Sequence, residues 1–498
     1  MAEGRPAASI VLFNPAPRVG SQVQRRVELP LGLLCCATPL VREGYAVRII
    51  DGFASPRWKG ELLDVLRNKP LCFGVTSMTG PQILRALDAC DTVRAMCPDV
   101  PIVWGGIHPT LLPEQTLEHP LVDVIVSGEG EETFSELVKA LEAGTPLGRV
   151  RGIWHTEHGQ ARFTGERPFV DLNAQPPLAY DLVDMDRYRR RLFGSDHVSF
   201  TSSRGCTFGC AFCWEPATNH RRWRAMQPET VLDHLKRLIR DYGIQGVLFT
   251  DDNFFVDMNR AYRILELIVR EELNVSIGKL QIRADTVCAM DQDFLTLLVR
   301  AGAKRLHMGV ESGSERVLKL INKGETIDEF IQANHMLRPF PLLPLYLFMM
   351  GLPTETPGEL AQSVRLAVQL ADENPRADPS FNIYTPYPGT ELFKTAIQLG
   401  LKPPARLEDW AQFNFRNVPR DCTWLAPGMT KLVEGLDFPL MFLGRNRFVT
   451  PYKKTNRLVV GLSRLYHPLA QYRLRNLDVR VPIETRLVKA LGLFGRQD

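Results

Sequence analysis

The chain has 498 residues, of which 45% are hydrophobic and 23% are charged; this composition is typical of folded proteins with two or three domains and excludes disordered chains. Its ten cysteines do not suggest a disulfide framework in so long a chain, which favours a reducing, cytoplasmic compartment. The start has no basic-then-apolar leader, and no apolar stretch reaches about eighteen residues, so neither a secretory signal nor a membrane span is expected.

The end of the chain is strongly basic. Residues 440–498 contain twelve Lys and Arg against three Asp and Glu, a net charge of +9, whereas the whole chain carries +4. Such a segment forms a solvated face, meets an anionic substrate or lies on an anionic membrane surface. It lacks the aromatic pattern of a known RNA-binding module, so no nucleic-acid partner is expected.

Residues 8–142 alternate short apolar runs with helical stretches. Runs such as "CFGVTSM" and "VDVIVSGEG" lack the alternation of a half-exposed strand, and stretches such as "PQILRALDACDTVRAM" separate them. This pattern predicts a parallel sheet with helices on both faces, an open doubly wound, Rossmann-like α/β domain.

The carboxyl ends of these expected strands are rich in glycine and hydroxyl side chains. Each end is an ordinary strand–helix turn when taken alone, but four on one edge predict a binding site, because ligands bind there in open parallel sheets. Small residues let the backbone approach a large ligand. The candidate binding residues are Ser77, Thr79, Gly105, Gly106, Gly128 and Glu129.

Residues 143–195 are expected to connect two domains. The stretch "GIWHTEHGQARF" predicts a hairpin, and the proline-broken segment after it is expected to run over the surface. Six strand-plus-helix units follow over residues 196–405 and predict a partial (β/α)6 barrel of the TIM type. Residues 406–498 are expected to form a basic, mainly helical C-terminal extension.

Three cysteines, Cys206, Cys210 and Cys213, follow the first strand of the expected barrel in a glycine-rich turn. Structural zinc sites take four Cys or His ligands, and His220 would be the fourth. No second cysteine pair follows, since the next cysteine is Cys288. A four-iron cluster held by three thiolates instead leaves one iron open for a small molecule, and this is the favoured interpretation.

Residues 196–395 resemble the radical S-adenosylmethionine superfamily. The spacing Cys-x3-Cys-x2-Cys, with an aromatic residue before the last cysteine, is that of its cluster loop. The resemblance implies a [4Fe-4S] cluster on the three cysteines and S-adenosylmethionine beside it, from which a 5′-deoxyadenosyl radical abstracts hydrogen from an unactivated carbon. The implied cofactor-binding residues are Phe212 near the adenine, Asp251 (with the adjacent Asp252) at the methionine amino group, Arg283, Asp285 and Glu311 at the ribose and carboxylate, and the backbone of Gly351 at the adenine.

Glu311 has an alternative to cofactor binding. A carboxylate and a guanidinium inside a barrel need each other or a ligand. An ion pair with Arg283 is therefore the competing interpretation of this residue.

The N-terminal half resembles the cobalamin-binding domain of the cobalamin-dependent branch of this superfamily. The matching stretches are "GVTSMTG", "VWGGIHPT" and "SGEGEETF", and the order of the two domains matches as well. The resemblance implies bound cobalamin. The histidine motif of the lower cobalt ligand is absent, since "NPAPRVG" stands in its place. His108, after a Gly-Gly turn, is an alternative lower ligand, but a position at the surface or on the phosphate side of the cofactor is the favoured interpretation.

Most members with this layout resemble methyltransferases, so the resemblance implies a C-methyltransferase that acts on an unactivated carbon. A cobalamin-dependent oxidative cyclase or oxidoreductase shares every motif above and is the alternative. A tRNA methylthiotransferase is a more distant one. It would need a second cluster, for which the remaining cysteines are not clearly placed; these are Cys35, Cys36, Cys72, Cys90 and Cys97, of which Cys90 and Cys97 fit core positions.

The substrate and partners follow only from resemblance. The basic tail resembles that of members acting on hopanoids and chlorophyll precursors, which implies a hydrophobic or anionic small molecule of lipid or tetrapyrrole type. An external low-potential electron donor is implied, because the cluster must be reduced. Basic charge interleaved with Leu, Phe and Tyr suits a cytoplasmic enzyme with a peripheral membrane contact, and a helix packed on the barrel explains it equally well. A non-enzymatic cobalamin sensor would not need the three cysteines.

Overall fold

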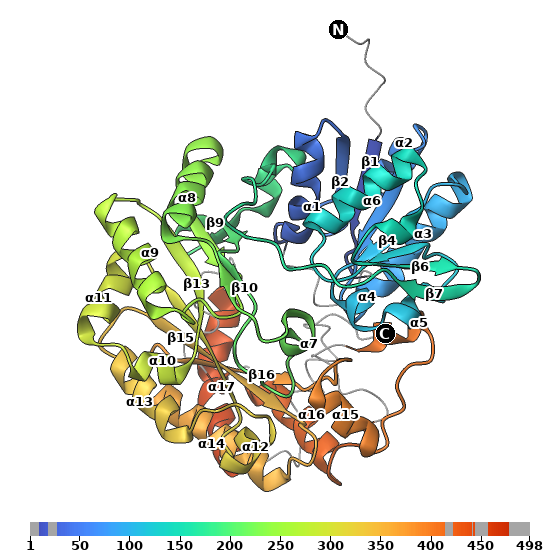
Figure 1. Cartoon of the computed structure of the whole chain (residues 1–498). Helices are drawn as coiled ribbons and strands as arrows, with labels where there is room; N and C mark the ends of the chain where they lie inside the picture. The colour runs from blue at the N-terminus through green and yellow to red at the C-terminus, as the bar shows by residue number, and fades with distance from the viewer. Residues whose placement is uncertain (1–8, 18–26, 414–421, 441, 444–456, 478–498) are drawn as a thin grey trace. The chain divides into compact units, whose positions relative to one another are not determined.

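The computed structural model describes residues 9–17, 27–413, 422–440, 442–443 and 457–477. These residues fall into two compact units (Figure 1). The first holds the described residues up to Tyr188 together with 403–413, and the second holds 189–402 and the described residues from 422 onward. The expected boundaries at 142, 195 and 405 differ from this division, because the connecting segment and residues 403–413 both pack on the first unit.

The first unit is built on a seven-stranded sheet with the strand order β2-β1-β3-β4-β5-β6-β7. Its first five strands are parallel, as the unbroken apolar runs predict. β6 and β7 form the expected hairpin, which extends the sheet antiparallel to β5. The strands are β1 (Ser9–Asn14), β2 (Ala46–Asp51), β3 (Cys72–Thr76), β4 (Ile102–Gly105), β5 (Val124–Val126), β6 (Ile153–Glu157) and β7 (Gln160–Phe163).

Helices cover both faces of this sheet, which confirms the doubly wound fold. α1 packs beside α6, and α2 packs beside α3. Strand order reverses between β1 and β3, and such a switch point leaves a crevice beyond the carboxyl ends of the strands. The helices are α1 (Leu31–Arg42), α2 (Trp58–Leu66), α3 (Gln82–Met96), α4 (Ile107–Leu111), α5 (Pro113–Leu117) and α6 (Glu131–Ala143).

Two later segments are tied to the first unit. The proline-broken segment ends in the short helix η4 (Met185–Tyr188), where the Tyr188 hydroxyl donates to the Asp51 carboxylate at 2.9 Å. Residues 403–413, which follow the barrel in sequence, belong again to the first unit, where the short helix η5 (Leu407–Gln412) packs beside α3. The buried Trp410 ring nitrogen donates to Gln115 at 2.6 Å and anchors this return.

The second unit is an open sheet with the order β16-β15-β14-β13-β12-β9-β8. Six of its strands are parallel and only β8 is antiparallel. Since β16 and β8 form the two edges, the barrel is not closed, and the expected partial (β/α)6 barrel is confirmed. The strands are β8 (Arg190–Leu192), β9 (Ser195–Phe200), β12 (Gly246–Phe249), β13 (Ser276–Ile282), β14 (Arg305–Glu311), β15 (Leu343–Met350) and β16 (Asp378–Ile383).

Helices pack on the outer face of this sheet. Along β15, alternate residues from Leu343 are half-buried and those between them are buried, as expected of a strand with an open inner face and a helix-covered outer face. Phe348 stacks on Phe381 of the neighbouring strand at 4.8 Å between ring centroids on the covered face. The helices are α8 (Pro228–Tyr242), α9 (Met258–Arg270), α10 (Ala284–Cys288), α11 (Gln292–Arg300), α12 (Glu315–Leu320), α13 (Ile327–Leu337), α14 (Pro357–Glu373) and α15 (Glu391–Gln398).

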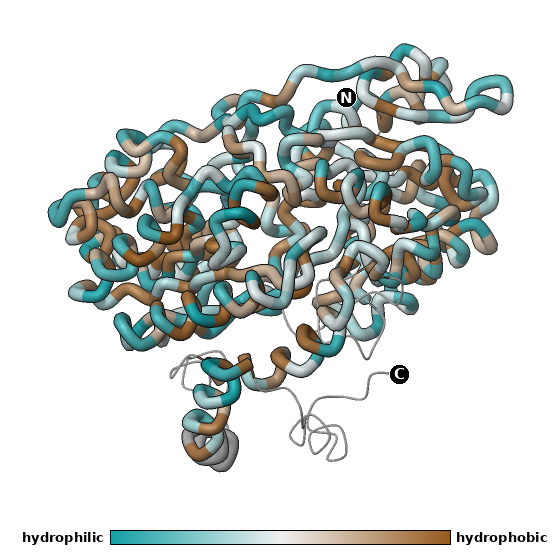
Figure 2. The backbone as a smooth tube through the Cα atoms, turned by 90° about the horizontal axis from the view of Figure 1, so that it is seen from below, coloured by the Kyte–Doolittle hydropathy of each residue, from teal (hydrophilic) through white to brown (hydrophobic). Residues whose placement is uncertain are grey.

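The basic extension contributes two helices to the second unit. α16 (Met429–Leu440) packs beside β16, and α17 (Arg457–Asn476) packs beside α14 and α16. Hydrophobic and hydrophilic residues are mixed along the outer helices (Figure 2). No helix in the described part of the chain is long and apolar enough to cross a membrane. Residues 444–456 and 478–498, where more helix was expected, lie outside the described residues.

Candidate active site

Cys206, Cys210 and Cys213 lie in the loop between β10 (Ser203–Arg204) and α7 (Glu215–Asn219). All three thiols are free and half-buried. Burial raises the pKa of each thiol, that of Cys213 to about 12, so the thiolates need a bound cation. Among the described residues, no three His, Cys, Asp or Glu side chains converge as they would around a single metal ion. The ligands of a four-iron cluster each bind a different iron, and three free thiols of one loop are the donor set that such a cluster takes.

Two carboxylates that follow β12 hold the start of the cluster loop. Asp251 is 1% exposed and accepts hydrogen bonds from the Ser202 N–H (2.8 Å), the Ser202 hydroxyl (2.6 Å) and the Ser203 hydroxyl (2.6 Å). Asp252 accepts from the Gly205 N–H at 3.0 Å; the residue is exposed, although partial burial of its carboxylate raises its pKa. The resemblance places both acids at the cofactor, and Asp252 is the more exposed residue of the two.

A turn at residues 321–325, directly after α12, holds the middle of the cluster loop. The Asn322 side chain donates to the carbonyl of Gly209 at 2.8 Å, and the turn accepts a backbone bond from the loop at 2.8 Å. Asn322 (φ 51°) and Gly324 (φ 67°) both adopt the left-handed backbone that such a tight turn needs. The cluster loop is therefore held by the protein itself, through β12 on one side and this turn on the other.

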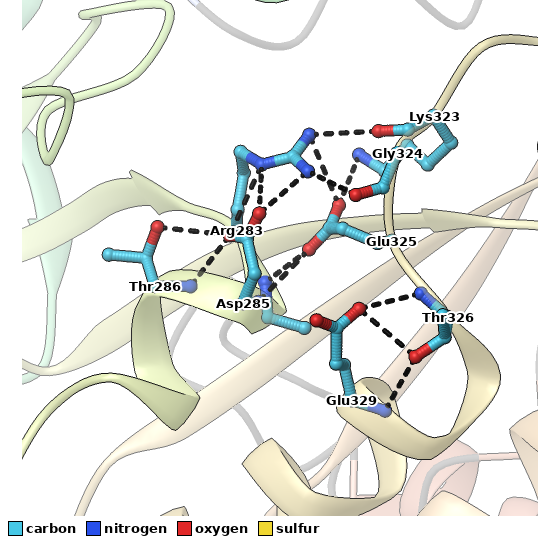
Figure 3. Close-up of polar contacts among 9 residues, drawn as sticks. Arg283, Asp285, Thr286, Lys323, Gly324, Glu325, Thr326 and Glu329 are labelled. Atoms are coloured by element: carbon cyan, nitrogen blue, oxygen red, sulfur yellow. Dashed lines mark hydrogen bonds and ion pairs between the residues drawn. The ribbon is translucent and has the colours of Figure 1, made fainter.

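Arg283, which follows β13, is fully engaged by neighbouring protein groups (Figure 3). Its guanidinium carbon lies 3.7 Å from the centroid of the Phe208 ring in the cluster loop. The guanidinium thus clamps the loop, although the sequence places it at the cofactor. Its partners are Asp285 (2.8 Å), the carbonyls of Lys323 (3.1 Å) and Gly324 (3.2 Å), and the carboxylate of Glu325 (3.4 Å).

Glu311, at the end of β14, is 9% exposed and has a left-handed backbone (φ 67°). A side chain at Gly309 would collide with its carboxylate, so this glycine makes room for it. The alternative ion pair with Arg283 is not formed, because Arg283 pairs with Asp285 and Glu325. Burial raises the pKa of Glu311 to about 7, although the neighbouring Lys323 opposes the shift.

Lys323 and Glu325 are functional candidates that sequence reasoning missed. Their side chains are 7% and 0% exposed and form an ion pair at 3.0 Å. Lys323, Glu311 and Glu325 all act electrostatically on the Cys210 thiol, so they gather beside the cluster loop. The sequence feature that could have pointed to them is the pair of opposite charges in the turn "NKGE", which follows the motif that contains Glu311.

The remaining candidates of the barrel lie in two places. Phe212 is half-buried in the cluster loop, next to Cys213. Gly351 follows β15 with a left-handed backbone (φ 81°), and its N–H donates to Glu355 at 2.7 Å. Its carbonyl accepts a hydrogen bond from the Trp424 ring at 3.1 Å. Trp424 belongs to the extension, and no sequence pattern linked it to this site.

The candidates of the first unit gather at the carboxyl ends of β3, β4 and β5. Gly106 (φ 94°) is required there, because a Cβ would lie 2.8 Å from the Ser77 carbonyl. Gly128 (φ 75°) faces open space, and Met78 between the two hydroxyl residues is 52% exposed. Glu129 turns away and accepts the Val170 N–H at 2.9 Å. This edge therefore offers small residues and one apolar side chain to a large ligand, which fits cobalamin.

His108 is buried, and the expectation of a surface position is wrong. The side chain is 0% exposed, because Trp410 of the returning segment covers it at 5.7 Å between ring centroids. Its Nδ1 lies 2.9 Å from the Thr79 hydroxyl. Burial lowers the pKa of His108 to about 4, so the ring is neutral at pH 7. The expected core positions of Cys90 and Cys97 are confirmed, at 0% and 5% exposed.

Comparisons with known proteins agree with this geometry. Residues 200–367 match the model of the radical SAM superfamily, and residues 25–138 match the model of the B12 binding domain. An uncharacterized methyltransferase of Pyrococcus horikoshii is 34% identical over 74% of this chain and 78% of its own length. The anaerobic magnesium-protoporphyrin IX monomethyl ester cyclase of Synechocystis sp. is 31% identical over 68% of this chain and 67% of its own length.

Two more distant proteins are also similar. The hopanoid C-3 methylase of Methylococcus capsulatus is 26% identical over 78% of this chain and 72% of its own length. The solved structure of the radical S-adenosylmethionine methyltransferase TsrM from Kitasatospora setae, which holds cobalamin and a [4Fe-4S] cluster, has a TM-score of 0.72. The match covers 96% of this chain and all of TsrM at 21% identity, so it shows a shared fold.

Proposed function

The chain belongs to the cobalamin-dependent radical S-adenosylmethionine family, and we propose that it methylates an unactivated carbon of a hydrophobic or anionic small molecule. The expected enzyme class, a cobalamin-dependent radical methyltransferase, is confirmed by its relatives, as are the cofactors [4Fe-4S], S-adenosylmethionine and cobalamin. The observation that carries the proposal is the pre-formed loop with three free thiols in a chain that also has a cobalamin-type sheet edge.

We assign the cluster to Cys206, Cys210 and Cys213, which are the three thiols of one loop. When bound, the cluster and S-adenosylmethionine supply the means to abstract a hydrogen atom, and cobalamin supplies the methyl group. The protein holds these groups in position and excludes water from them. The clamp of Arg283 on Phe208 keeps the loop in shape before any metal is bound.

S-Adenosylmethionine is proposed to bind beside Cys210. An acidic group, Glu311, and a basic group, Lys323, lie together there, which suits the amino and carboxylate groups of its methionine part. Asp252 is the accessible acid on the other side of the loop. The backbone of Gly351 and the ring of Phe212 are proposed to contact the adenine.

Cobalamin is proposed to bind at the carboxyl edge of the first sheet. Ser77, Thr79, Gly105, Gly106 and Gly128 line this edge. The hydroxyls of Ser77 and Thr79 already bond to the Met78 carbonyl and to His108, so they shape the edge rather than reach out from it. The Glu129 carboxylate accepts a hydrogen bond from the Val170 N–H and so ties this edge to the connecting segment.

The substrate class is inferred from relatives and from the extension. Two relatives are named as a hopanoid methylase and as a cyclase of a protoporphyrin monomethyl ester, and the substrate proposed here is of the same lipid or tetrapyrrole type. On α17, Leu465, Leu469 and Tyr472 form one exposed stripe, at 78%, 46% and 59% exposed. With the net charge of +9 over residues 440–498, this stripe suits an anionic bilayer from which such a substrate would be drawn. All ten cysteines are free, which suits a cytoplasmic enzyme. An external low-potential electron donor is proposed because the cluster must be reduced.

The test uses enzyme reconstituted anaerobically with iron, sulfide and cobalamin, together with a low-potential reductant and S-adenosylmethionine deuterated in its methyl group. We expect S-adenosylhomocysteine beside 5′-deoxyadenosine, and deuterium in the cobalamin fraction, when a hopanoid or a protoporphyrin ester is offered. A product heavier by one labelled methyl group identifies the substrate. The Cys210→Ala variant is the control that should give no 5′-deoxyadenosine.

An oxidative cyclase is the second candidate, because a relative named as a cyclase is nearly as similar as the relative named as a methyltransferase. The same experiment separates the two. If 5′-deoxyadenosine forms without S-adenosylhomocysteine and without label in the cobalamin fraction, methyl transfer is ruled out and oxidation becomes the conclusion.

A further inference from the structure

The peptide groups of Gly351 are fixed on both sides by side chains. Its backbone is left-handed (φ 81°), a conformation that must be maintained by neighbours. The N–H is held by the Glu355 carboxylate at 2.7 Å, and the carbonyl is held by the Trp424 ring N–H at 3.1 Å. Glu355 also accepts the next N–H, from Leu352, at 3.2 Å. The N–H and the carbonyl of Gly351 are therefore each held by a buried side chain, Glu355 and Trp424 respectively.

Glu355 belongs to the same loop, but Trp424 comes from outside the barrel. The match to the radical SAM superfamily ends at residue 367, and Trp424 lies in the extension that follows. The edge strand β16 would otherwise be left open, and α16 packs beside it. The stretch before α16 carries Trp424 to the carboxyl end of β15, next to the edge.

The Trp424 ring is held in one orientation by its burial and its contacts. It is 3% exposed, and its ring lies edge-on to Tyr384 at 6.5 Å between centroids. The Tyr384 N–H donates to the Met350 carbonyl at 2.9 Å, directly before Gly351. The next residue, Leu425, lies 3.3 Å from where a Cβ on Gly351 would stand. Trp424 thus packs against both strands whose ends form this part of the site.

We propose that Trp424 is a positioning residue for S-adenosylmethionine. Its ring N–H fixes the Gly351 carbonyl, whose second lone pair is left to accept a hydrogen bond from the adenosyl part. The inference rests on the proposed role of Gly351. The extension, which follows the matched family domains, would thus contribute to cofactor binding as well as cover the edge strand β16.

The test compares Trp424→Phe with wild type in the full-length, cluster-loaded protein, with S-adenosylhomocysteine as the probe. Phenylalanine keeps an aromatic ring beside Tyr384 but has no N–H for the Gly351 carbonyl. We expect the Kd for S-adenosylhomocysteine to rise about threefold to tenfold, as for the loss of one neutral hydrogen bond. The Kd for cobalamin and the iron content should be unchanged. In turnover, KM for S-adenosylmethionine should rise while kcat is largely kept.

Trp410→Phe is the matched control. It also removes a buried indole donor, but one that bonds Gln115 in the first unit. It should leave the Kd for S-adenosylhomocysteine unchanged. If Trp424→Phe folds poorly, replacement of Trp424 by benzothienylalanine, which has the shape of tryptophan without the N–H, gives the same comparison.

Two results would overturn the proposal. One is a Kd for S-adenosylhomocysteine in the benzothienylalanine protein equal to that of wild type. The other is an equal rise in the Kd for S-adenosylhomocysteine and the Kd for cobalamin in Trp424→Phe, together with a lower unfolding temperature. That result would mean that Trp424 has a purely structural role. A wild-type protein that binds no S-adenosylhomocysteine would instead refute the proposed function, so the two failures are distinguishable.

Discussion

The guanidinium of Arg283 lies over the ring of Phe208, with the guanidinium carbon 3.7 Å from the centroid of the ring. Phe208 lies between the first two cysteines of the cluster loop, so this contact joins the loop to the end of β13. Cation–π pairs of this kind are strengthened when they are shielded from water. Here Asp285 and the turn at residues 321–325 keep the guanidinium in place.

We therefore predict that Arg283→Lys loosens the cluster loop. Lysine keeps the charge but loses the planar fork and the stacking surface, so the substitution is not conservative at this position. The free energy of unfolding should fall by about 2 kcal/mol, as buried hydrogen bonds to a charged group are lost. Iron content after reconstitution should fall with it. The exposed Arg300→Lys is the control, and iron content equal to wild type in Arg283→Lys would refute the clamp.

The two carboxylates after β12 should behave differently. Asp251→Asn disturbs three buried hydrogen bonds from Ser202 and Ser203 and removes one of the two carboxylate charges that act on the buried Arg260, the other being that of Asp257. We expect a loss of about 3 kcal/mol in the free energy of unfolding, together with low iron content. Asp252→Asn should keep stability and iron content but weaken S-adenosylmethionine binding. Equilibrium unfolding and S-adenosylmethionine binding are measured on both variants. If Asp251→Asn instead weakens binding at unchanged stability, and Asp252→Asn lowers stability, Asp251 is the cofactor ligand.

These two acids illustrate what the sequence can predict. The strand ends, the cysteine loop and the two domain types were predictable because each depends on local patterns of apolar, small and thiol residues. Which of two adjacent acids faces the open side depends on how Ser202 and Ser203 pack against β12, and no local pattern records it. The same holds for Arg283, which the resemblance places at the cofactor: its bond to a turn some forty positions later has no local pattern either.

Long-range packing explains the other differences. His108 was expected at the surface because it follows a glycine pair, yet Trp410, which returns after the whole barrel, buries it. Trp424 reaches Gly351 in a similar way. Neither contact has a periodic or spacing signal, because each is made by a segment that the family domains do not include.

Glu311 should make the cofactor-free protein sensitive to pH. Burial raises its pKa from 4.5 to about 7, so the folded protein binds more protons than the unfolded chain between these values. The free energy of unfolding therefore falls as pH rises through this window. We expect the difference in pH dependence between wild type and Glu311→Gln to reach about 2 to 3 kcal/mol between pH 4.5 and 7.5. Urea titrations at a series of pH values measure it, and parallel curves for the two proteins would contradict the burial of this carboxyl.

The stripe on α17 should bind anionic membranes. Replacing Leu465, Leu469 and Tyr472 by serine removes the exposed apolar surface but leaves the buried face of the helix, with Ala470 and Leu474, intact. We expect less co-sedimentation with phosphatidylserine vesicles, and wild-type binding that weakens as salt is added. Deletion of residues 440–498 should have the same effect. Tyr262→Ser, at a 44% exposed position on α9, is the control, and partitioning of the triple variant equal to wild type would count against membrane contact.

His108 should respond to acid and should not be a cobalt ligand. Its ring is 0% exposed between Thr79 and Trp410, and burial lowers its pKa from 6.5 to about 4. The unfolded chain therefore takes up a proton between these values before the folded protein does, and the free energy of unfolding falls as pH drops from 6.5 toward 4. In His108→Gln, whose amide can still bond Thr79, this acid sensitivity should shrink by about 2 to 3 kcal/mol. The electron paramagnetic resonance spectrum of the bound cobalt(II) form should be the same in both proteins. Nitrogen splitting that vanishes in His108→Gln would show that the first unit opens to place this histidine on cobalt.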